Sequence, residues 1–178
     1  MFYKTNLNYN EPLKPRPRTK YIVIHHTEML PPHSVECVHR WHQEKGWAGI
    51  GYHYYIRRNG DIFQSRPRDT QGAHVKVEGH AYNSESVGVC FEGDFRTETL
   101  PDKQLEASIL LLSILNLMYR DSEFRTHHEL DGQKVCPGGN FPVQRLLQKV
   151  QEQKQRFIDL YGDPKVVDYS FLLKSLEG

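Results

Sequence analysis

The run "YIVI" at residues 21–24 constrains the fold of this chain more than any other feature. All four side chains are apolar or aromatic, so both faces of a strand formed by them would be buried, as in a sheet with helices on both sides. The run ends at His25, which places that imidazole at the exit of the strand. A second run, "SVGVCFEG" at 86–93, predicts another buried strand. The two runs together predict a central sheet.

The segment "YHYYIRRNGDIFQS", residues 52–65, predicts a β-hairpin in the same sheet. Two strand-like halves flank Asn59-Gly60, a dipeptide that favours the tight turn between antiparallel strands. The sheet is therefore expected to be mixed, not wholly parallel.

Three segments have the apolar spacing of helices. They are residues 33–46, with Gly46 as the expected stop, residues 101–119 after Pro101, and the segment that begins at Pro142. The predicted fold class is α/β, a single domain in which about three helices flank the central mixed sheet.

Length and composition agree with one globular domain, because 178 residues with 38% hydrophobic and 25% charged side chains can bury a core. We expect an extended, Pro-rich N-terminal arm at 1–20, the domain itself at 21–160, and a C-terminal tail at 161–178. The net charge of +1 gives no reason to expect a nucleic-acid partner. The longest apolar run, around 109–115, is too short to span a bilayer, and we expect a monomer that does not insert into membranes.

The cysteines and the N-terminus bear on the compartment in which the chain acts. Three cysteines without a C-x-x-C pair favour free thiols over a disulfide framework. Residues 1–20 contain no apolar run after their basic residues, so we expect synthesis in the cytoplasm without a secretory signal peptide.

Two histidine doublets and one cysteine predict a metal site. The doublets are at 25–26 and 127–128, and Cys136 follows in "KVCPGG". A catalytic zinc ion takes three protein ligands from His, Cys or carboxylate side chains and keeps a fourth position open. A histidine at a strand exit, a distant histidine and a loop cysteine supply such a set, and the ends of strands carry the functional loops of an α/β sheet.

Other interpretations of these residues remain open. Histidines at strand ends are often hydrogen-bonded structural residues, and a cysteine before Pro-Gly can simply pack as a small apolar side chain. A thiol protease could use Cys136 with a histidine. That reading is disfavoured because Cys136 precedes a proline in a loop and does not open a helix that would lower its pKa.

Five ordered blocks resemble the N-acetylmuramoyl-L-alanine amidase type 2 family, which includes the T7-type phage lysozymes and the peptidoglycan recognition proteins. The blocks are "IVIHHT", "WHQEKGWAGIGYHYYIRRNGDIFQSRP", "GAHV", "YNSESVGVCFEGDF" and "HHELDGQKVCPG", and the match runs from about residue 21 to 147. The chain lacks the closely spaced cysteine pair of the animal recognition proteins, which favours a bacterial or phage enzyme.

The resemblance implies that zinc is bound by His25, by a histidine of the late doublet and by Cys136. Relatives usually place that histidine eight residues before the cysteine, a spacing that selects His128 here. Alignment of the doublet with the acidic residue after it selects His127 instead, with one extra residue in "LDGQ". We favour His127, because insertions belong in loops.

The resemblance also implies roles for residues around the metal. Tyr52 of "GYH" and Lys134, two residues before the cysteine, match positions that assist catalysis in active members. We expect substrate-binding roles for His26, Thr27, His74 and Asn83. For His74 and Asn83 the alternative is a hydrogen bond that only fixes a loop. Trp41 and Trp47 are expected in the core or in the groove wall.

The expected function is zinc-dependent hydrolysis of the amide between N-acetylmuramic acid and L-alanine, with peptidoglycan or muropeptides as partner. The alternative is a non-catalytic peptidoglycan-binding or sensing module of the same fold. Without a signal peptide, the chain would reach the cell wall through phage lysis or a secretion system, or would act on cytoplasmic muropeptides.

Overall fold

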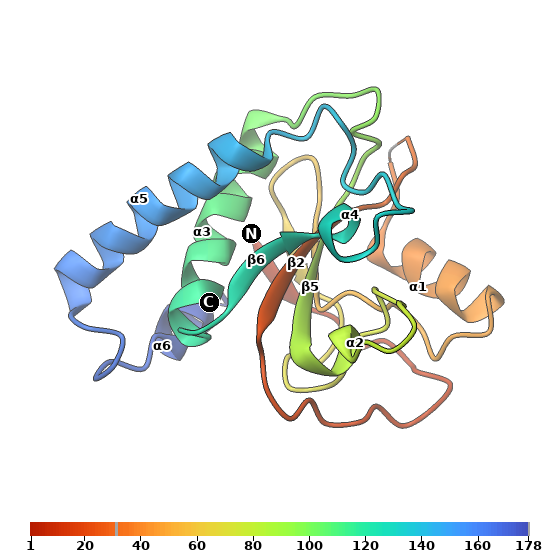
Figure 1. Ribbon diagram of the computed structural model, residues 1–178, viewed down its shortest axis with the longest axis horizontal. Coiled ribbons are helices and arrows are strands. Elements are labelled where there is room, and N and C mark those ends of the chain that lie inside the picture. The colour runs from red at the N-terminus through yellow and green to blue at the C-terminus, as the bar shows by residue number, and fades with distance from the viewer. Residues whose placement is uncertain (31, 178) are drawn as a thin grey trace.

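Six strands form one mixed sheet in the order β1-β4-β3-β5-β2-β6 (Figure 1). This computed structural model describes residues 1–30 and 32–177. The strands are β1 (Phe2–Lys4), β2 (Tyr21–His26), β3 (Tyr54–Ile56), β4 (Ile62–Gln64), β5 (Ser86–Phe91) and β6 (Glu123–Thr126). Strands β3 and β4 are antiparallel around Asn59-Gly60, and every other neighbouring pair is parallel. The predicted hairpin and the predicted mixed sheet are confirmed.

The arm expected at residues 1–20 is partly built into this sheet. Strand β1 pairs in parallel with β4, with Phe2 opposite Ile62. Further along, the phenol of Tyr9 donates a hydrogen bond to the Ser65 carbonyl over 2.8 Å. The segment is therefore packed against the domain instead of extending from it, and the division of the chain at residues 20 and 160 stays a prediction.

The described residues form three long helices and three short ones. The long helices are α1 (Val35–Glu44), α3 (Asp102–Met118) and α5 (Val143–Tyr161), and they agree with the three predicted segments. The short helices are α2 (Tyr82–Glu85), α4 (His127–Leu130) and α6 (Ser170–Ser175), and α6 lies in the expected tail. No helix among the residues described is both long and apolar enough to cross a membrane.

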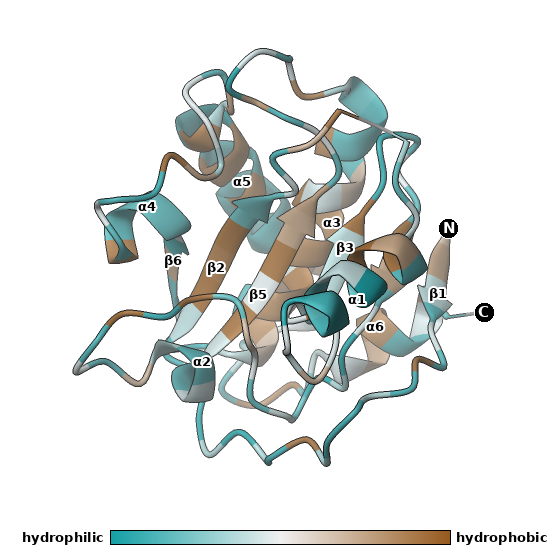
Figure 2. Ribbon diagram, turned by 90° about the vertical axis from the view of Figure 1, so that its right-hand side faces the viewer, coloured by the Kyte–Doolittle hydropathy of each residue, from teal (hydrophilic) through white to brown (hydrophobic). Residues whose placement is uncertain are grey.

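The two faces of the sheet are covered by different helices, with α3 and α5 on one side and α1 on the other (Figure 1). The larger core joins apolar residues of β2, β3 and β5, such as Ile24 and Val89, to α3, α5 and α6. Figure 2 shows the apolar middle of the sheet between helices with polar outer faces. A smaller core packs Tyr55 and Cys90 against α1. Both faces of β2 are thus buried, as "YIVI" predicted.

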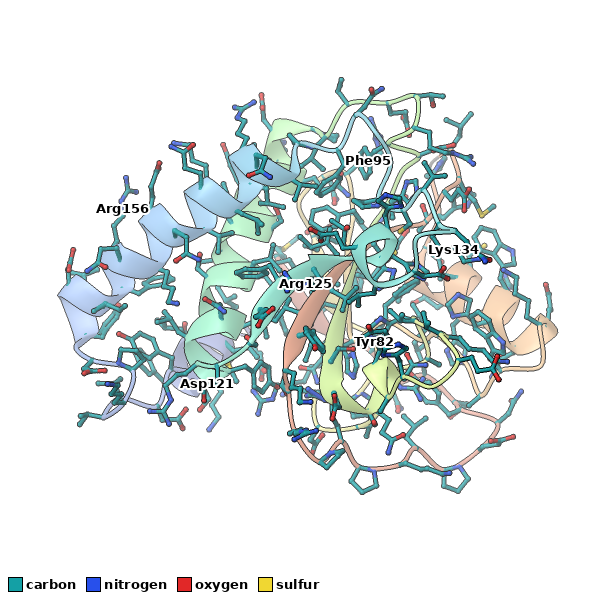
Figure 3. The ribbon with its side chains drawn as sticks, viewed as in Figure 1. Tyr82, Phe95, Asp121, Arg125, Lys134 and Arg156 are labelled. Carbon is teal, nitrogen blue, oxygen red and sulfur yellow. The ribbon has the colours of Figure 1, made fainter. Side chains whose placement is uncertain are left out.

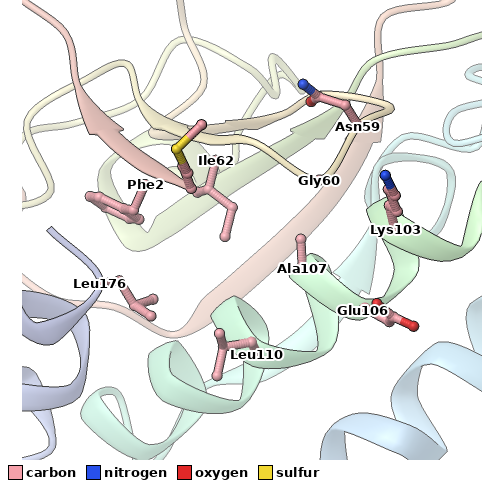
Figure 4. Close-up of a pocket in the computed structure, with 10 residues that line it drawn as sticks. Phe2, Asn59, Gly60, Ile62, Lys103, Glu106, Ala107, Leu110 and Leu176 are labelled. Carbon is pink, nitrogen blue, oxygen red and sulfur yellow. The ribbon is translucent and has the colours of Figure 1, made fainter. Parts of the chain in front are cut away.

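Two further features are separate from the histidine doublets. All three cysteines are free thiols, as the sequence predicted. A cavity of about 540 Å³ lies beside β1, the β3–β4 turn and α3, and Figure 4 shows the residues that line it. Its lining contains none of the expected site residues, so it plays no part in the site described next.

Candidate metal centre

One nitrogen each from His25 and His127 and the sulfur of Cys136 converge at one edge of the sheet. The three donor atoms lie within 4.8 Å of one another. His25 is near the end of β2, His127 opens α4, and Cys136 lies in the loop between α4 and α5. Because β2, β5 and β6 run parallel, their carboxyl ends meet at this edge.

A capping box places His127 beside His25. The Thr126 hydroxyl accepts a hydrogen bond from the Glu129 amide over 3.2 Å, and the Glu129 carboxylate accepts one from the Thr126 amide over 2.6 Å. This pair starts a helix at the residue after β6. Since β6 pairs with β2, the ring centroids of His25 and His127 come to lie 4.7 Å apart.

The loop that carries Cys136 is held against β2 and the segment after β5. The Cys136 sulfur accepts a hydrogen bond from the His26 amide over 3.3 Å and lies 3.8 Å from Nδ1 of His25. Gly138 has a φ of 102°, and a β-carbon there would come within 2.4 Å of the Phe95 carbonyl carbon. Only glycine fits both the angle and the space. The backbone thus brings a thiol from the last quarter of the chain onto the second strand.

The second histidine of each doublet turns away from the three donors. Consecutive strand residues point to opposite faces, so His26 lies on the other face from His25 and accepts the Phe95 amide at Nδ1 over 3.2 Å. His128 is exposed and donates from Nδ1 to the Lys134 carbonyl over 2.6 Å. The structure therefore groups His127, not His128, with His25 and Cys136. Their role as ligands stays a prediction.

Burial sets the protonation of the three donors. It is the main cause that lowers the pKa of His25 well below 6.5, and it also lowers the pKa of His127. Both imidazoles are neutral at pH 7, as metal ligands must be. Burial raises the pKa of the Cys136 thiol to about 12, so that a bound cation is needed to hold it as a thiolate at neutral pH.

Tyr52 and Lys134 both line the groove beside this cluster. The ring centroids of Tyr52 and His25 are 5.1 Å apart. Burial raises the pKa of the Tyr52 hydroxyl well above 10, so it stays protonated and can donate. Lys134 lies on the loop that follows α4 (Figure 3).

Two adjoining cavities, of about 380 and 680 Å³, make up this groove. Both are lined by Trp47, Tyr52, His127, Gln133 and Lys134. The smaller one continues past His26 and Thr27, and the larger one past His74 and Asn83. Of the residues for which a site role was expected, all except the fully buried His25 line the groove.

The expected substrate-binding residues have partners within the protein. The Thr27 hydroxyl exchanges hydrogen bonds with the Gly93 backbone, and the Asn83 side-chain oxygen accepts the amides of His74 and Val75. His74 is buried and its Nδ1 lies 2.9 Å from Nε2 of His25. These contacts fix loops and rings, and a contact of these side chains with substrate stays a prediction.

His42 is a groove residue that the sequence interpretation missed. It lines the smaller cavity beside Trp47, with the two ring centroids 4.6 Å apart. Its Nδ1 accepts the Gly51 amide over 3.0 Å, which leaves the N–H on Nε2 for another partner. Burial lowers its pKa to about 4, so the ring is neutral. The sequence "WHQEKGW" could have pointed to His42 as a groove residue, because it follows Trp41 directly in an amphipathic helix.

Comparison with known proteins agrees with this geometry. Residues 15–139 match the family model described as N-acetylmuramoyl-L-alanine amidase. The chain is 34% identical over 141 residues to an endolysin of Klebsiella phage KP32, covering 75% of this chain and 89% of that protein.

Solved structures give the same result. The endolysin and N-acetylmuramoyl-L-alanine amidase LysCS from Clostridium intestinale superposes with a TM-score of 0.79 and 30% identity, over 85% of this chain and 95% of that one. The complex of peptidoglycan recognition proteins LCa and LCx with tracheal cytotoxin gives a TM-score of 0.70 at 26% identity, over 81% and 94% of the chains. The segment matched by the family model contains strands β2 to β6, the hairpin and all three donor residues, and it covers more than half of the sequence. The chain belongs to the N-acetylmuramoyl-L-alanine amidase family.

Proposed function

We propose that this protein is a zinc-dependent peptidoglycan amidase that hydrolyses the bond between N-acetylmuramic acid and L-alanine. The observation that carries the proposal is the convergence of two neutral imidazoles and one thiol beside a groove that His127 and Cys136 line. The family model, the phage endolysin and the clostridial amidase support the class of reaction.

The donor set fits zinc better than other common metals. Two imidazole nitrogens with one sulfur form a soft three-ligand set, typical of catalytic zinc and foreign to magnesium or calcium, which prefer oxygen. The His26 amide that points at Cys136 favours the thiolate over the thiol. A zinc ion held by His25, His127 and Cys136 would act as a Lewis acid toward the scissile carbonyl and make water at the site more acidic.

Two side chains of the groove are suited to the transition state. Tyr52 has a protonated hydroxyl beside His25, from which it would donate a proton or hydrogen bond toward the leaving nitrogen. Lys134 carries a positive charge in both cavities of the groove, where it would stabilise negative charge that develops on the carbonyl oxygen.

The groove supports a substrate with both sugar and peptide parts. Its two cavities extend in different directions from Tyr52, one past Thr27 and one past Asn83. Trp47 is 43% exposed between them, and its indole is available to pack on a sugar ring or a peptide. We infer that glycan and stem peptide occupy different cavities, with the scissile amide between them.

The test is incubation of the zinc-loaded protein with defined muropeptides and identification of the products by mass. We expect a free stem peptide that begins with L-alanine and a sugar that retains its lactyl group. The same incubation with a chelator should give no product. Cleavage of a glycosidic or peptide bond would contradict the proposed reaction. Binding of muropeptide without any cleavage would favour a recognition module of the same fold.

A further inference from the structure

A series of buried hydrogen bonds leads from His25 through His74 and Ser86 to helix α2. Nε2 of His25 lies 2.9 Å from Nδ1 of His74. Nε2 of His74 lies 3.2 Å from the hydroxyl oxygen of Ser86. That hydroxyl lies 2.6 Å from the carbonyl oxygen of Tyr82, in α2 (Figure 3). His25, His74 and Ser86 are all at most 7% exposed, so water does not compete for these bonds.

The hydrogen bond from Ser86 to the Tyr82 carbonyl determines which group donates in each of the other hydrogen bonds of the series. A carbonyl oxygen only accepts, so the single hydroxyl proton of Ser86 must point at Tyr82. The Ser86 oxygen then accepts from Nε2–H of His74. A neutral imidazole has one N–H, which leaves a lone pair on Nδ1 of His74, and this lone pair accepts from Nε2–H of His25. The lone pair of His25 is thereby placed on Nδ1, the nitrogen 3.8 Å from the Cys136 sulfur.

We propose that His74 and Ser86 are positioning residues, which fix His25 in the Nε2–H tautomer and hold its Nδ1 lone pair toward the metal site. Both ring nitrogens of His74 are used inside the protein. We therefore assign His74 to the support of His25 in place of the substrate contact expected from the sequence.

The packing around His74 supports this assignment independently of the hydrogen bonds. A β-carbon on Gly72 would come within 2.3 Å of Cδ2 of His74, and one on Gly88 within 2.7 Å of the same atom. Two glycines thus make room for the ring. The Asn83 side chain, by accepting the His74 amide over 2.8 Å, holds the backbone below it. The imidazole is confined to one position, as a group that orients another must be.

The surroundings of the two rings favour their neutral forms, which have one N–H each. Both rings are buried, and their hydrogen-bond partners among the described residues include no carboxylate that would hold a second proton. Partners that orient a metal-bound histidine usually change metal affinity by about 10- to 100-fold when they are removed.

The first test uses metal-free protein with ¹⁵N-labelled histidine. Long-range ¹H–¹⁵N correlation at pH 7 distinguishes the two tautomers of each imidazole. We expect the Nε2–H tautomer for both His25 and His74. The Nδ1–H tautomer at either residue would overturn the proposal. This measurement does not depend on zinc or on amidase activity.

The second test measures zinc affinity by competition with a chelator. Ser86→Ala removes the bond that sets the direction, although Ser86 is two hydrogen bonds away from the donor cluster, and we expect about 10- to 100-fold weaker zinc binding. The matched control is Ser108→Ala, which removes a buried hydroxyl that donates over 2.7 Å to the Leu105 carbonyl within α3. We expect the control to bind zinc as the wild type does. Equal affinity of wild type and Ser86→Ala, or equal loss in both variants, would overturn the proposal.

A third variant, His74→Phe, keeps a ring between Gly72 and Gly88 but cannot accept from His25. It should weaken zinc binding by a similar factor while its thermal unfolding stays cooperative, and unchanged affinity would count against the proposal.

The positioning role of His74 and Ser86 rests on the proposed function in one respect, the assignment of His25 as a zinc ligand. Different results would contradict the positioning role and the proposed function. A wild type that binds zinc tightly and cleaves no muropeptide would end the proposed function, whereas a loss of zinc affinity in Ser86→Ala would still support the role of the chain of bonds. A wild type without zinc affinity would end the zinc assignment, and the tautomers of His25 and His74 would then decide the inference.

Discussion

The backbone amide of His26 donates a hydrogen bond to the sulfur of Cys136 over 3.3 Å, although 110 residues separate them in the chain. Strand β2 thus contributes to the donor cluster twice, through the side chain of His25 and through the backbone of the next residue. Amide donors favour the charged form of a sulfur, and a cation at the cluster favours it further.

Cys136→Ala and His127→Ala should each abolish stoichiometric zinc binding, because either change leaves only two of the three donors. His128→Ala should retain zinc, since its ring is hydrogen-bonded to the Lys134 carbonyl and exposed. Metal content after dialysis measures both. Loss of zinc in His128→Ala with retention in His127→Ala would show that the doublet was assigned in the wrong order.

Zinc binding at pH 7 should release about one proton per ion. The thiol of Cys136, whose pKa burial raises to about 12, is protonated in the free protein and must lose its proton to bind metal. His25 and His127 are already neutral and add nothing. Zinc affinity should therefore rise about tenfold per pH unit through the neutral range. Titration calorimetry in buffers of different ionisation enthalpy measures the number of protons released. A zinc affinity that does not change between pH 7 and 9 would contradict the predicted loss of the Cys136 proton.

Tyr52→Phe and Lys134→Ala should keep zinc and lower kcat by on the order of 100-fold each, if each side chain acts on the transition state. Turnover of a soluble muropeptide, with zinc content determined on the same sample, measures the effect. Tyr55→Phe is the matched control, because it removes a hydroxyl that donates to the His33 carbonyl, in the core beside α1. Wild-type turnover in both site variants would remove their catalytic role.

The metal-free protein should lose stability as the pH falls below about 6.5. His53 is fully buried, accepts the Gly88 amide and reaches the Thr70 carbonyl, and burial lowers its pKa to about 3. Between pH 6.5 and 3 the unfolded chain binds a proton at this residue and the folded one does not, which costs ~1.4 kcal/mol per pH unit. His42 adds to the loss down to its pKa of about 4. Urea unfolding at pH 7 and pH 5 tests this, and equal stability would contradict it.

Gly60→Ala should destabilise the fold by about 1–3 kcal/mol. Gly60 has a φ of 87°, and a β-carbon there would lie 2.8 Å from the Lys103 carbonyl oxygen, across the cavity rim in Figure 4. Gly79→Ala is the control, because Gly79 has a φ of 76° with no atom within 4 Å of the added carbon. Chemical denaturation measures the free energy of unfolding of both variants. A larger decrease in Gly60→Ala than in Gly79→Ala would be due to the contact with Lys103, because both variants carry the backbone strain of a positive φ. Equal decreases would show that the structure relaxes to relieve that contact.

The sequence predicted the elements whose signal is local. Two-sided apolar runs gave β2 and β5, Asn59-Gly60 gave the hairpin, and apolar spacing gave the three long helices. Strand β1 was missed because its three residues form a strand only by pairing with β4, about sixty positions away. Helix α4 had a visible signal, the capping box "THHE", which was not used.

The donor cluster was predicted from residue types and from resemblance, whereas the hydrogen bonds of His74 to His25 and Ser86 were not. Its sequence context, "GAHV", suggested a groove residue. Its hydrogen bonds connect three residues that are far apart in the sequence, His25, His74 and Ser86. The local sequence around any one of these residues does not reveal that the ring is buried between two glycines. Tertiary packing decides which nitrogen of a histidine is free, and a single sequence does not contain that information.

The parallel pairing of β2 with β5 and β6 also imposes an order on biosynthesis. Residues 21–26 leave the ribosome first, but their backbone partners are residues 86–91 and 123–126. Until these emerge, β2 has unpaired edges that invite association with other nascent chains. The donor cluster is complete only after residue 136 of 178. A polypeptide interrupted before residue 123 therefore lacks both β6 and Cys136, so the three donor residues can come together only late in translation.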